Sequence, residues 1–195
     1  MPRLSLLITG VPGTGKTTLA KSLCKKTGAA LIEINELAEL LGLYSHTDPS
    51  DGAKVVRLQK LERELSLAIK AEKGSVVVDG HLGCEFPLPV QKVIVLRCEP
   101  SELRRRLAPR NYPQAKMAQN ALAEALDYCT INAEKHYGRR RVFELDTTGK
   151  APKQALAEAE KTILGKMKKK LRVSFPQALM REAISGEKIR KAFHE

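Results

Sequence analysis

The sequence predicts an α/β fold in which helices cover both faces of a mainly parallel β-sheet. Short apolar runs of strand length alternate along the chain with stretches of helical periodicity, which is the pattern of parallel sheets. A glycine-rich segment also separates the first apolar run from the first helical stretch. A chain of 195 residues is long enough to bury the core of one such domain.

The glycine-rich segment, residues 10–18, reads Gly-Val-Pro-Gly-Thr-Gly-Lys-Thr-Thr and fits the pattern G-x-x-x-x-G-K-[ST]. The apolar run from Leu4 to Thr9 precedes it with the length of a buried strand, and Leu19 and Leu23 follow at helical spacing. The alternative is a chance glycine-rich turn, which would leave this strand–turn–helix order unexplained. The sequence therefore predicts a P-loop, and with it a P-loop NTPase fold that binds a nucleoside triphosphate.

Each residue type in the P-loop suits contact with phosphate. Glycines allow backbone N–H groups to approach phosphate oxygens, and the following helix adds the positive end of its dipole. Lys16 can reach the β- and γ-phosphates, the Thr17 hydroxyl can ligate Mg²⁺, and Thr18 can bond toward the α-phosphate. The predicted nucleotide-binding residues of the loop are Gly13, Thr14, Gly15, Lys16, Thr17 and Thr18.

The remaining elements follow from apolar periodicity and from glycine and proline breaks. Strands are predicted at 29–33, 75–79, 92–98 and 141–146. Helices are predicted at 34–41, 53–73, 100–107, 116–135 and 155–169, with Asn35 as the N-cap of the first of these. Residues 44–52 combine proline, glycine, serine and aspartate, which is typical of a loop.

Asp79 and His81 follow a buried strand at the edge of the sheet where ligands bind. In a P-loop fold, a carboxylate at this position lies beside the nucleotide and can hold Mg²⁺ directly or through a water. The alternative is that Asp79 only caps the turn into Gly80. A lone histidine is usually a loop residue, but His81 follows Asp79 so closely that a role as base or water-positioning group is credible.

Four arginines, Arg104, Arg105, Arg106 and Arg110, gather where the 100–107 helix ends. Guanidinium groups bind a phosphoryl group through two parallel hydrogen bonds, which lysine cannot do. Arg106 and Arg110 are four residues apart and can share a helix face, so they are the candidates for this role. Arg104 and Arg105 are expected to point elsewhere, into solvent.

The composition, with 43% apolar and 29% charged residues, is that of a soluble globular protein, and no apolar run reaches the length of a membrane span. The first strand begins close to the N-terminus, so we expect no signal peptide and a cytoplasmic protein. The four cysteines are scattered without a C-x-x-C pair. We therefore expect buried free thiols rather than disulfides or a zinc site.

Five motifs now stand in a recognisable order and spacing. They are Gly10–Thr18, Asn35–Ala38, Asp79–His81, Arg106–Tyr112 and Thr148–Lys150. Over about residues 1–165 the chain resembles the adenylate kinase isoenzyme 6 family, including its archaeal members. The most specific elements are the Asp-x-His step and the R-L-x-x-R-x-Y segment. The chain departs from ordinary adenylate kinases, which carry D-G-F-P-R where this chain has Asp-Gly-His-Leu-Gly from residue 79.

The resemblance implies a nucleoside monophosphate kinase fold with a P-loop core, a monophosphate-binding segment at about 34–53 and a short lid at about 109–118. It also implies adenylate kinase activity with ATP, Mg²⁺ and AMP, together with ATPase activity. Lys16, Asp79, His81, Arg106 and Arg110 would be catalytic, with Arg106 and Arg110 as the lid arginines. Thr17 and Asp79 would bind the metal. Lys150 would lie against adenine, Arg110 would also contact ATP, and Asn35 and Arg106 would bind the acceptor.

Proteins of this family also act in maturation of the small ribosomal subunit, where they bind a ribosomal protein near rRNA. The formal net charge of +12 suits such an anionic partner, and residues 166–195 hold nine Lys or Arg residues against three Glu residues. This C-terminal extension is a helix packed on the core, a contact with RNA or a ribosomal protein, or a partly disordered tail. It lacks a stacking motif, so sequence-specific RNA recognition is not expected.

Three hypotheses follow for the function. The first is an adenylate kinase, and the second is a nucleotide-switched ribosome assembly factor whose main activity is ATP hydrolysis. The third is a kinase of another small metabolite. Dependence on AMP distinguishes them, because only the first makes ADP much faster when AMP is present. The sequence leaves the oligomeric state open, although a monomer is favoured.

Overall fold

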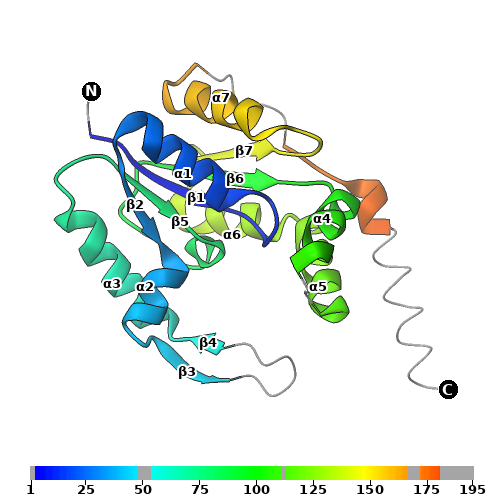
Figure 1. Cartoon of the computed structure of the whole chain (residues 1–195), viewed down its shortest axis with the longest axis horizontal. Coiled ribbons are helices and arrows are strands. Elements are labelled where there is room, and N and C mark those ends of the chain that lie inside the picture. The colour runs from blue at the N-terminus through cyan, green and yellow to red at the C-terminus, as the bar shows by residue number, and fades with distance from the viewer. Residues whose placement is uncertain (1–2, 48–53, 111–112, 167–171, 181–195) are drawn as a thin grey trace.

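The computed structural model describes residues 3–47, 54–110, 113–166 and 172–180, and within them five parallel strands form the central sheet (Figure 1). The strands are β1 (Ser5–Thr9), β2 (Ala30–Glu33), β5 (Val76–Asp79), β6 (Lys92–Arg97) and β7 (Val142–Asp146). Their order is β2-β5-β1-β6-β7, so the P-loop strand β1 lies at the centre. The predicted fold class is confirmed, and the strand bounds agree with the sequence prediction to within a residue or so.

Helices cover both faces of this sheet (Figure 1). On one face lie α1 (Lys16–Thr27) and α7 (Pro152–Ile163), and on the other lie α3 (Leu58–Ala71) and α6 (Tyr128–Tyr137). Successive side chains of a strand point to opposite faces. Leu6 and Ile8 of β1 accordingly pack into the core with α1 and α7, whereas Leu7 packs into the core with α3 and α6.

The remaining helices and two 3₁₀ turns lie around the edge of the sheet where the parallel strands end. These are α2 (Ile34–Leu40), α4 (Pro100–Leu107), α5 (Gln114–Ala125) and the 3₁₀ turns η1 (His81–Cys84) and η2 (Ala108–Arg110). Pro100 occupies the first turn of α4, where its missing N–H is harmless, and the Glu99 side chain caps the helix by accepting from the backbone of Ser101 and Glu102. The start of α2 corrects one prediction, because Glu33 is its N-cap and Asn35 lies inside the first turn.

A hairpin replaces part of the predicted loop at 44–52 and the first turn of the predicted 53–73 helix. Its strands are β3 (Tyr44–Thr47) and β4 (Lys54–Val56), which pair antiparallel. The β-branched pair Val55 and Val56 favours this strand over helix. The Lys54 ammonium contacts both the Glu39 carboxylate, at 2.8 Å, and the Tyr44 ring. Residues 48–53 lie outside the described part of the chain.

The predicted helix at 116–135 is two helices, α5 and α6, which meet at Asp127. Asp127 has a φ of 55°, a left-handed conformation that ends the regular helix. Its carboxylate lies 2.5 Å from the Arg97 guanidinium, which ties the bend to the buried end of β6. An ion pair between distant segments therefore sets a break that the apolar periodicity does not reveal.

The last predicted helix, at 155–169, is α7 in the structure, and it both begins and ends earlier than predicted. It starts at Pro152, in the first turn, and ends at Ile163, shortly before Gly165 with a φ of 69°. Residues 167–171 and 181–195 lie outside the described part, so the interpretation of the C-terminal extension is tested only at 172–180. No helix among the described residues has the length and apolarity needed to cross a membrane.

Candidate nucleotide-binding site

The P-loop connects the central strand β1 directly to helix α1, and its glycines have backbone conformations that other residues avoid. Gly10 has a φ of 138°, and a Cβ there would lie 2.5 Å from the Leu96 carbonyl oxygen. Gly13 has a φ of 93°, and a Cβ there would lie 2.8 Å from a Leu103 methyl group. The loop thus packs tightly on β6 and α4, and only glycine fits at these two positions.

Lys16, the first residue of α1, reaches back over the loop. Its Nζ donates a hydrogen bond to the Val11 carbonyl at 2.9 Å. Lys16 also lines a cavity of about 190 Å³ together with Thr17, Asn35, Asp79 and His81. Lys16 therefore helps to line a polar pocket formed by the P-loop and the ends of β2 and β5.

Thr17 and Asp79 form the oxygen-rich corner of this pocket. The Thr17 hydroxyl donates to Asp79 Oδ2 at 2.6 Å, and Asp79 is only 4% exposed. Among the described residues, Asp79 Oδ1 has no hydrogen-bond partner although it is buried. A hydroxyl and a carboxylate are ligands that Mg²⁺ prefers, and a buried oxygen without a partner is suited to a cation or its bound water. These two residues therefore fit the predicted metal site.

Burial makes the ionised form of Asp79 unfavourable in the protein without ligands. It raises the pKa of the Asp79 carboxyl, and the hydrogen bond from Thr17 and the charge of Lys16 oppose this shift only in part. We expect Asp79→Asn to increase the free energy of unfolding of nucleotide-free, metal-free protein by about 1 kcal/mol at pH 7, because it removes a buried charge with an incompletely paired carboxylate. Chemical denaturation of both proteins measures the difference.

The same experiment has a defined dependence on pH. A raised pKa means that the folded protein holds the Asp79 proton more tightly than the unfolded chain does. The resulting stabilisation is complete below the ordinary value of 3.8 and is lost as the pH rises through the folded-state pKa. The increase in the free energy of unfolding caused by Asp79→Asn should therefore become smaller as the pH falls toward 4. A gain that stays constant across this range would contradict the account, and Glu36→Gln serves as a control on an exposed carboxylate of α2.

His81 begins the 3₁₀ turn that follows β5 and contacts the P-loop from the side. Its Nδ1 lies 3.2 Å from the Gly10 carbonyl oxygen, which can only accept, so Nδ1 carries the proton. Burial lowers the pKa of His81, and the nearby charge of Lys16 acts in the same direction. The imidazole is therefore neutral at pH 7, and its other nitrogen, Nε2, is an acceptor.

A second and larger cavity, of about 410 Å³, lies on the other side of the P-loop. Its lining includes Thr14, Gly15 and Thr18 of the loop and Arg106 and Lys150 from later in the chain. The P-loop thus lines two cavities. The smaller one is polar and includes Asp79, and the larger one is wide enough for part of a nucleoside. Of the predicted P-loop residues, Gly13, Lys16 and Thr17 line the first, while Thr14, Gly15 and Thr18 line the second.

The predicted basic residues are held by partners within the fold. Arg106 donates to the Thr147 carbonyl at 2.7 Å and to Glu102 at 2.9 Å, so its guanidinium is fixed beside the larger cavity. Lys150 forms an ion pair with Glu158 at 2.8 Å. The structure thus places Arg106 away from Lys16 and Asp79, in a different cavity. Arg105 is exposed, as expected, but it pairs with Glu102 at 2.7 Å and also lines the larger cavity. Arg104 is half-buried, which corrects the expectation that it points into solvent. The side chain of Arg110 lies outside the described part.

Two features of the site were not predicted from the sequence. The Thr147 hydroxyl lies 3.1 Å from the Thr14 carbonyl and 2.9 Å from the Arg97 carbonyl, which connects the loop after β7 to the P-loop. Glu33, at the end of β2, lines the smaller cavity and pairs with Lys21 at 2.8 Å. Position at the C-terminal end of a predicted parallel strand is the signal that could have identified both residues.

A family model described as "AAA domain" matches residues 6–127. A protein from Methanothermobacter thermautotrophicus named "Putative adenylate kinase" is 40% identical over 75% of this chain and 82% of its own length. Proteins of the same name from Methanocaldococcus jannaschii and Natronomonas pharaonis are 32% and 35% identical, over 86% and 83% of this chain and 90% of their own lengths.

Among solved structures, a sugar kinase from a Janibacter species aligns with a TM-score of 0.57 and 16% sequence identity. The alignment covers 91% of this chain and 98% of that one. At this identity the similarity concerns the fold, which is that of a P-loop kinase.

Proposed function

Because this chain belongs to the same family of P-loop nucleotide kinases as these archaeal proteins, we propose that it is an adenylate kinase. It would transfer the γ-phosphoryl group of Mg-ATP to AMP. The observation that carries the proposal is the pair of cavities on either side of the P-loop. A phosphoryl transfer between two nucleotides needs a donor site and an acceptor site that meet at the transferred group.

The donor would occupy the larger cavity. Its phosphates would follow the backbone N–H groups of the P-loop toward the N-terminus of α1, which favours negative charge. Arg106 and Lys150, which line this cavity, would lie along the nucleoside and the phosphates. Arg110, in the adjacent lid, would reach the transferred group when the lid closes over it.

The smaller cavity would hold the reacting phosphates. Lys16 would leave the Val11 carbonyl and bind the β- and γ-phosphates, because it already lines this pocket. Thr17 and Asp79 would hold Mg²⁺, which neutralises developing charge on the phosphoryl oxygens when bound. Asn35, on α2 beside Asp79, would contact the acceptor AMP, which would sit between the 34–53 segment and the lid.

ATP hydrolysis is the second activity that we propose, and His81 supports it. Its neutral imidazole is anchored to Gly10 through Nδ1, which leaves Nε2 as an acceptor beside the reacting phosphates. Such an acceptor can orient a water for attack. The net charge of +12 further supports an anionic or ribonucleoprotein partner, and we propose a role in small ribosomal subunit maturation with a ribosomal protein near rRNA.

The rate of ADP formation from Mg-ATP, measured with and without AMP, tests the proposed kinase. We expect AMP to raise this rate well above basal hydrolysis, and other nucleoside monophosphates or sugars to raise it less. If a sugar or another small acceptor stimulated more strongly than AMP, the enzyme would be a different kinase. A rate that no small acceptor changes would instead favour a nucleotide switch.

His81→Ala should lower ATP hydrolysis in the absence of AMP by about 100-fold, because it removes the group that orients the attacking water. His81→Asn is the matched control, since its amide nitrogen can keep the hydrogen bond to Gly10 but offers no acceptor in place of Nε2. Both variants should lose hydrolysis, while ADP formation from AMP should fall less. Normal hydrolysis by His81→Asn would show that His81 only holds the P-loop in place.

A further inference from the structure

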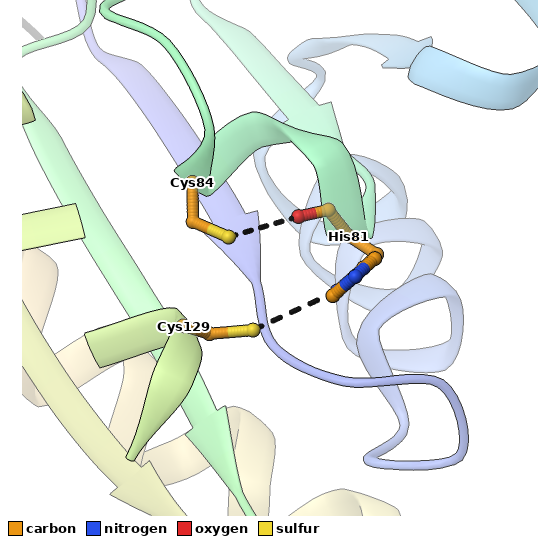
Figure 2. Close-up of side chains that lie close together, drawn as sticks. All are labelled: His81, Cys84 and Cys129. Atoms are coloured by element: carbon orange, nitrogen blue, oxygen red, sulfur yellow. Dashed lines mark hydrogen bonds between the residues drawn. The ribbon is translucent and has the colours of Figure 1, made fainter. Parts of the chain in front are cut away.

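Three side chains with metal-binding atoms converge next to the P-loop: His81, Cys84 and Cys129 (Figure 2). His81 and Cys84 lie at the two ends of η1, and Cys129 enters from the start of α6. One ligand atom from each residue lies within 4.8 Å of the other two. Cys84 and Cys129 are 45 positions apart in sequence, so the spacing of the cysteines gives no sign of this cluster.

We propose that His81, Cys84 and Cys129 form a binding site for a thiophilic divalent cation of the zinc type. Two thiolates and one imidazole are a ligand set that favours zinc over magnesium or calcium, which take oxygen ligands. This cation site shares no residue with the Thr17–Asp79 pair, and its ligand atoms are sulfur and nitrogen rather than oxygen.

The distances suit a tetrahedral ion. With Zn–S of about 2.3 Å and Zn–N of about 2.05 Å, sulfur and nitrogen ligands of a tetrahedral site lie about 3.6 Å apart. Cys129 Sγ lies 3.6 Å from His81 Nδ1, so one edge of the tetrahedron is already formed. Cys84 Sγ lies 3.2 Å from the His81 carbonyl oxygen, and it would give up this hydrogen bond when it binds the ion.

Burial and charge also suit an ion with two thiolates. Cys84 is 0% exposed and Cys129 is 2% exposed, so both thiols are shielded from solvent. Two thiolates would balance the charge of a divalent cation and leave a neutral buried site. Of the three ligands, His81 also lines the smaller cavity, so the cluster lies one side chain away from a polar pocket. Buried cysteines usually pack as small apolar residues. Here, however, the distance from Cys129 Sγ to an imidazole nitrogen is that between two ligands of one metal ion.

Occupancy of the site would change the hydrogen bonds of His81. Nδ1 carries the proton that it donates to the Gly10 carbonyl, and a metal at Nδ1 requires a lone pair there. The imidazole would give up the Nδ1 proton and gain one at Nε2, while each thiol would release its proton to solvent. Nε2 would then donate rather than accept, so the ion should slow ATP hydrolysis. This consequence rests on the proposed function of His81, whereas the site itself does not.

Cobalt is a suitable probe because thiolate ligands give Co²⁺ an intense charge-transfer absorption that oxygen ligands do not give. The experiment titrates Co²⁺ into nucleotide-free full-length protein kept reduced by a phosphine, and then adds Zn²⁺ in competition. We expect the absorption to saturate at one ion per chain and to disappear when Zn²⁺ is added. Loss of a group that only supports a ligand weakens metal binding by about 10- to 100-fold, so Cys84→Ser and Cys129→Ser should weaken it by at least about 100-fold.

Cys24→Ser is the matched control, because Cys24 lies on α1, outside the cluster. Its thiol donates a hydrogen bond to the Ala30 carbonyl. This variant should bind Co²⁺ as the wild type does. Far-ultraviolet circular dichroism of each variant checks that it is folded. Absence of the thiolate absorption in folded wild type would overturn the proposal. Absorption in Cys84→Ser and Cys129→Ser as strong as in the wild type would overturn it too. Zn²⁺ binding without slower hydrolysis would keep the site and reject only its proposed effect on His81.

Discussion

Replacing Lys16 with methionine should lower the rate of AMP-dependent ADP formation at saturating ATP by about 100- to 1000-fold. Among the described residues, Lys16 is the only lysine or arginine that lines the smaller cavity, which it shares with Thr17 and Asp79. Loss of one donor that stabilises charge in a transition state typically costs about this much. Methionine keeps most of the volume of the side chain, so the loss would reflect the missing charge. Steady-state kinetics with AMP and Mg-ATP both saturating give the comparison.

Lys25→Met is the matched control, because Lys25 lies on the same helix α1 and is exposed to solvent. It removes one positive charge of the chain without touching the P-loop, and its rate should stay within about two-fold of the wild type. If Lys16→Met kept more than a tenth of the wild-type rate, the P-loop lysine would not stabilise the transferred phosphoryl group. The assignment of the smaller cavity as the reaction centre would then be wrong.

The second large effect concerns stability and centres on Arg97, at the end of β6. Arg97 is 1% exposed and lies 2.7 Å from Glu124 and 2.5 Å from Asp127, and it also contacts Glu144. Arg97→Met should lower the free energy of unfolding by about 3–5 kcal/mol, because it leaves buried carboxylates without their cation. For a chain of this length the midpoint of thermal unfolding should fall by about 6–20 °C. Calorimetry measures both quantities.

Lys54→Met provides the contrast with an exposed ion pair. Lys54 lies 2.8 Å from Glu39, and both side chains are more than half exposed, so this change should lower the free energy of unfolding far less than Arg97→Met does. Equal destabilisation by the two variants would mean that the buried ion pairs of Arg97 contribute no more to the free energy of unfolding than an exposed pair does. The same cluster also anchors the described part of the C-terminal extension, since Arg97 donates to the Val173 carbonyl at 3.0 Å and lies 5.5 Å from the Phe175 ring.

The central sheet and the P-loop could be predicted because their signals are local. A buried strand, a glycine-rich turn and an amphipathic helix follow one another within residues 4–27. Asp79 was identified by its place at the end of an apolar strand, and the structure puts it 2.6 Å from Thr17. These features depend on the order of residues in the chain and on the rule that ligands bind at the ends of parallel strands.

The breaks and clusters formed by distant segments could not be predicted in this way. The bend at Asp127 depends on Arg97, which is 30 residues away in sequence and lies on a different element. The hairpin of β3 and β4 depends on cross-strand pairing that helical periodicity hides. The His81, Cys84 and Cys129 cluster joins two elements that meet only when α6 packs on the sheet.

The position of Arg106 shows the same limit within the site. Its spacing from Arg110 predicts a shared helix face, and Arg106 indeed projects from α4 toward a cavity. The structure adds that Glu102 and Thr147 hold the guanidinium beside the larger cavity. Contact of Arg106 with the acceptor stays a prediction, because it requires the lid to bring the two cavities together.

The destination of the γ-phosphoryl group tests the central claim most directly. ATP labelled in its γ-phosphate is mixed with unlabelled AMP and Mg²⁺, and the products are separated within the first turnovers. If the chain is an adenylate kinase, the label should appear mainly in ADP, and Lys16→Met should slow its transfer by about 100- to 1000-fold. Label released as inorganic phosphate at the same rate with or without AMP would contradict the claim and identify ATP hydrolysis as the main reaction.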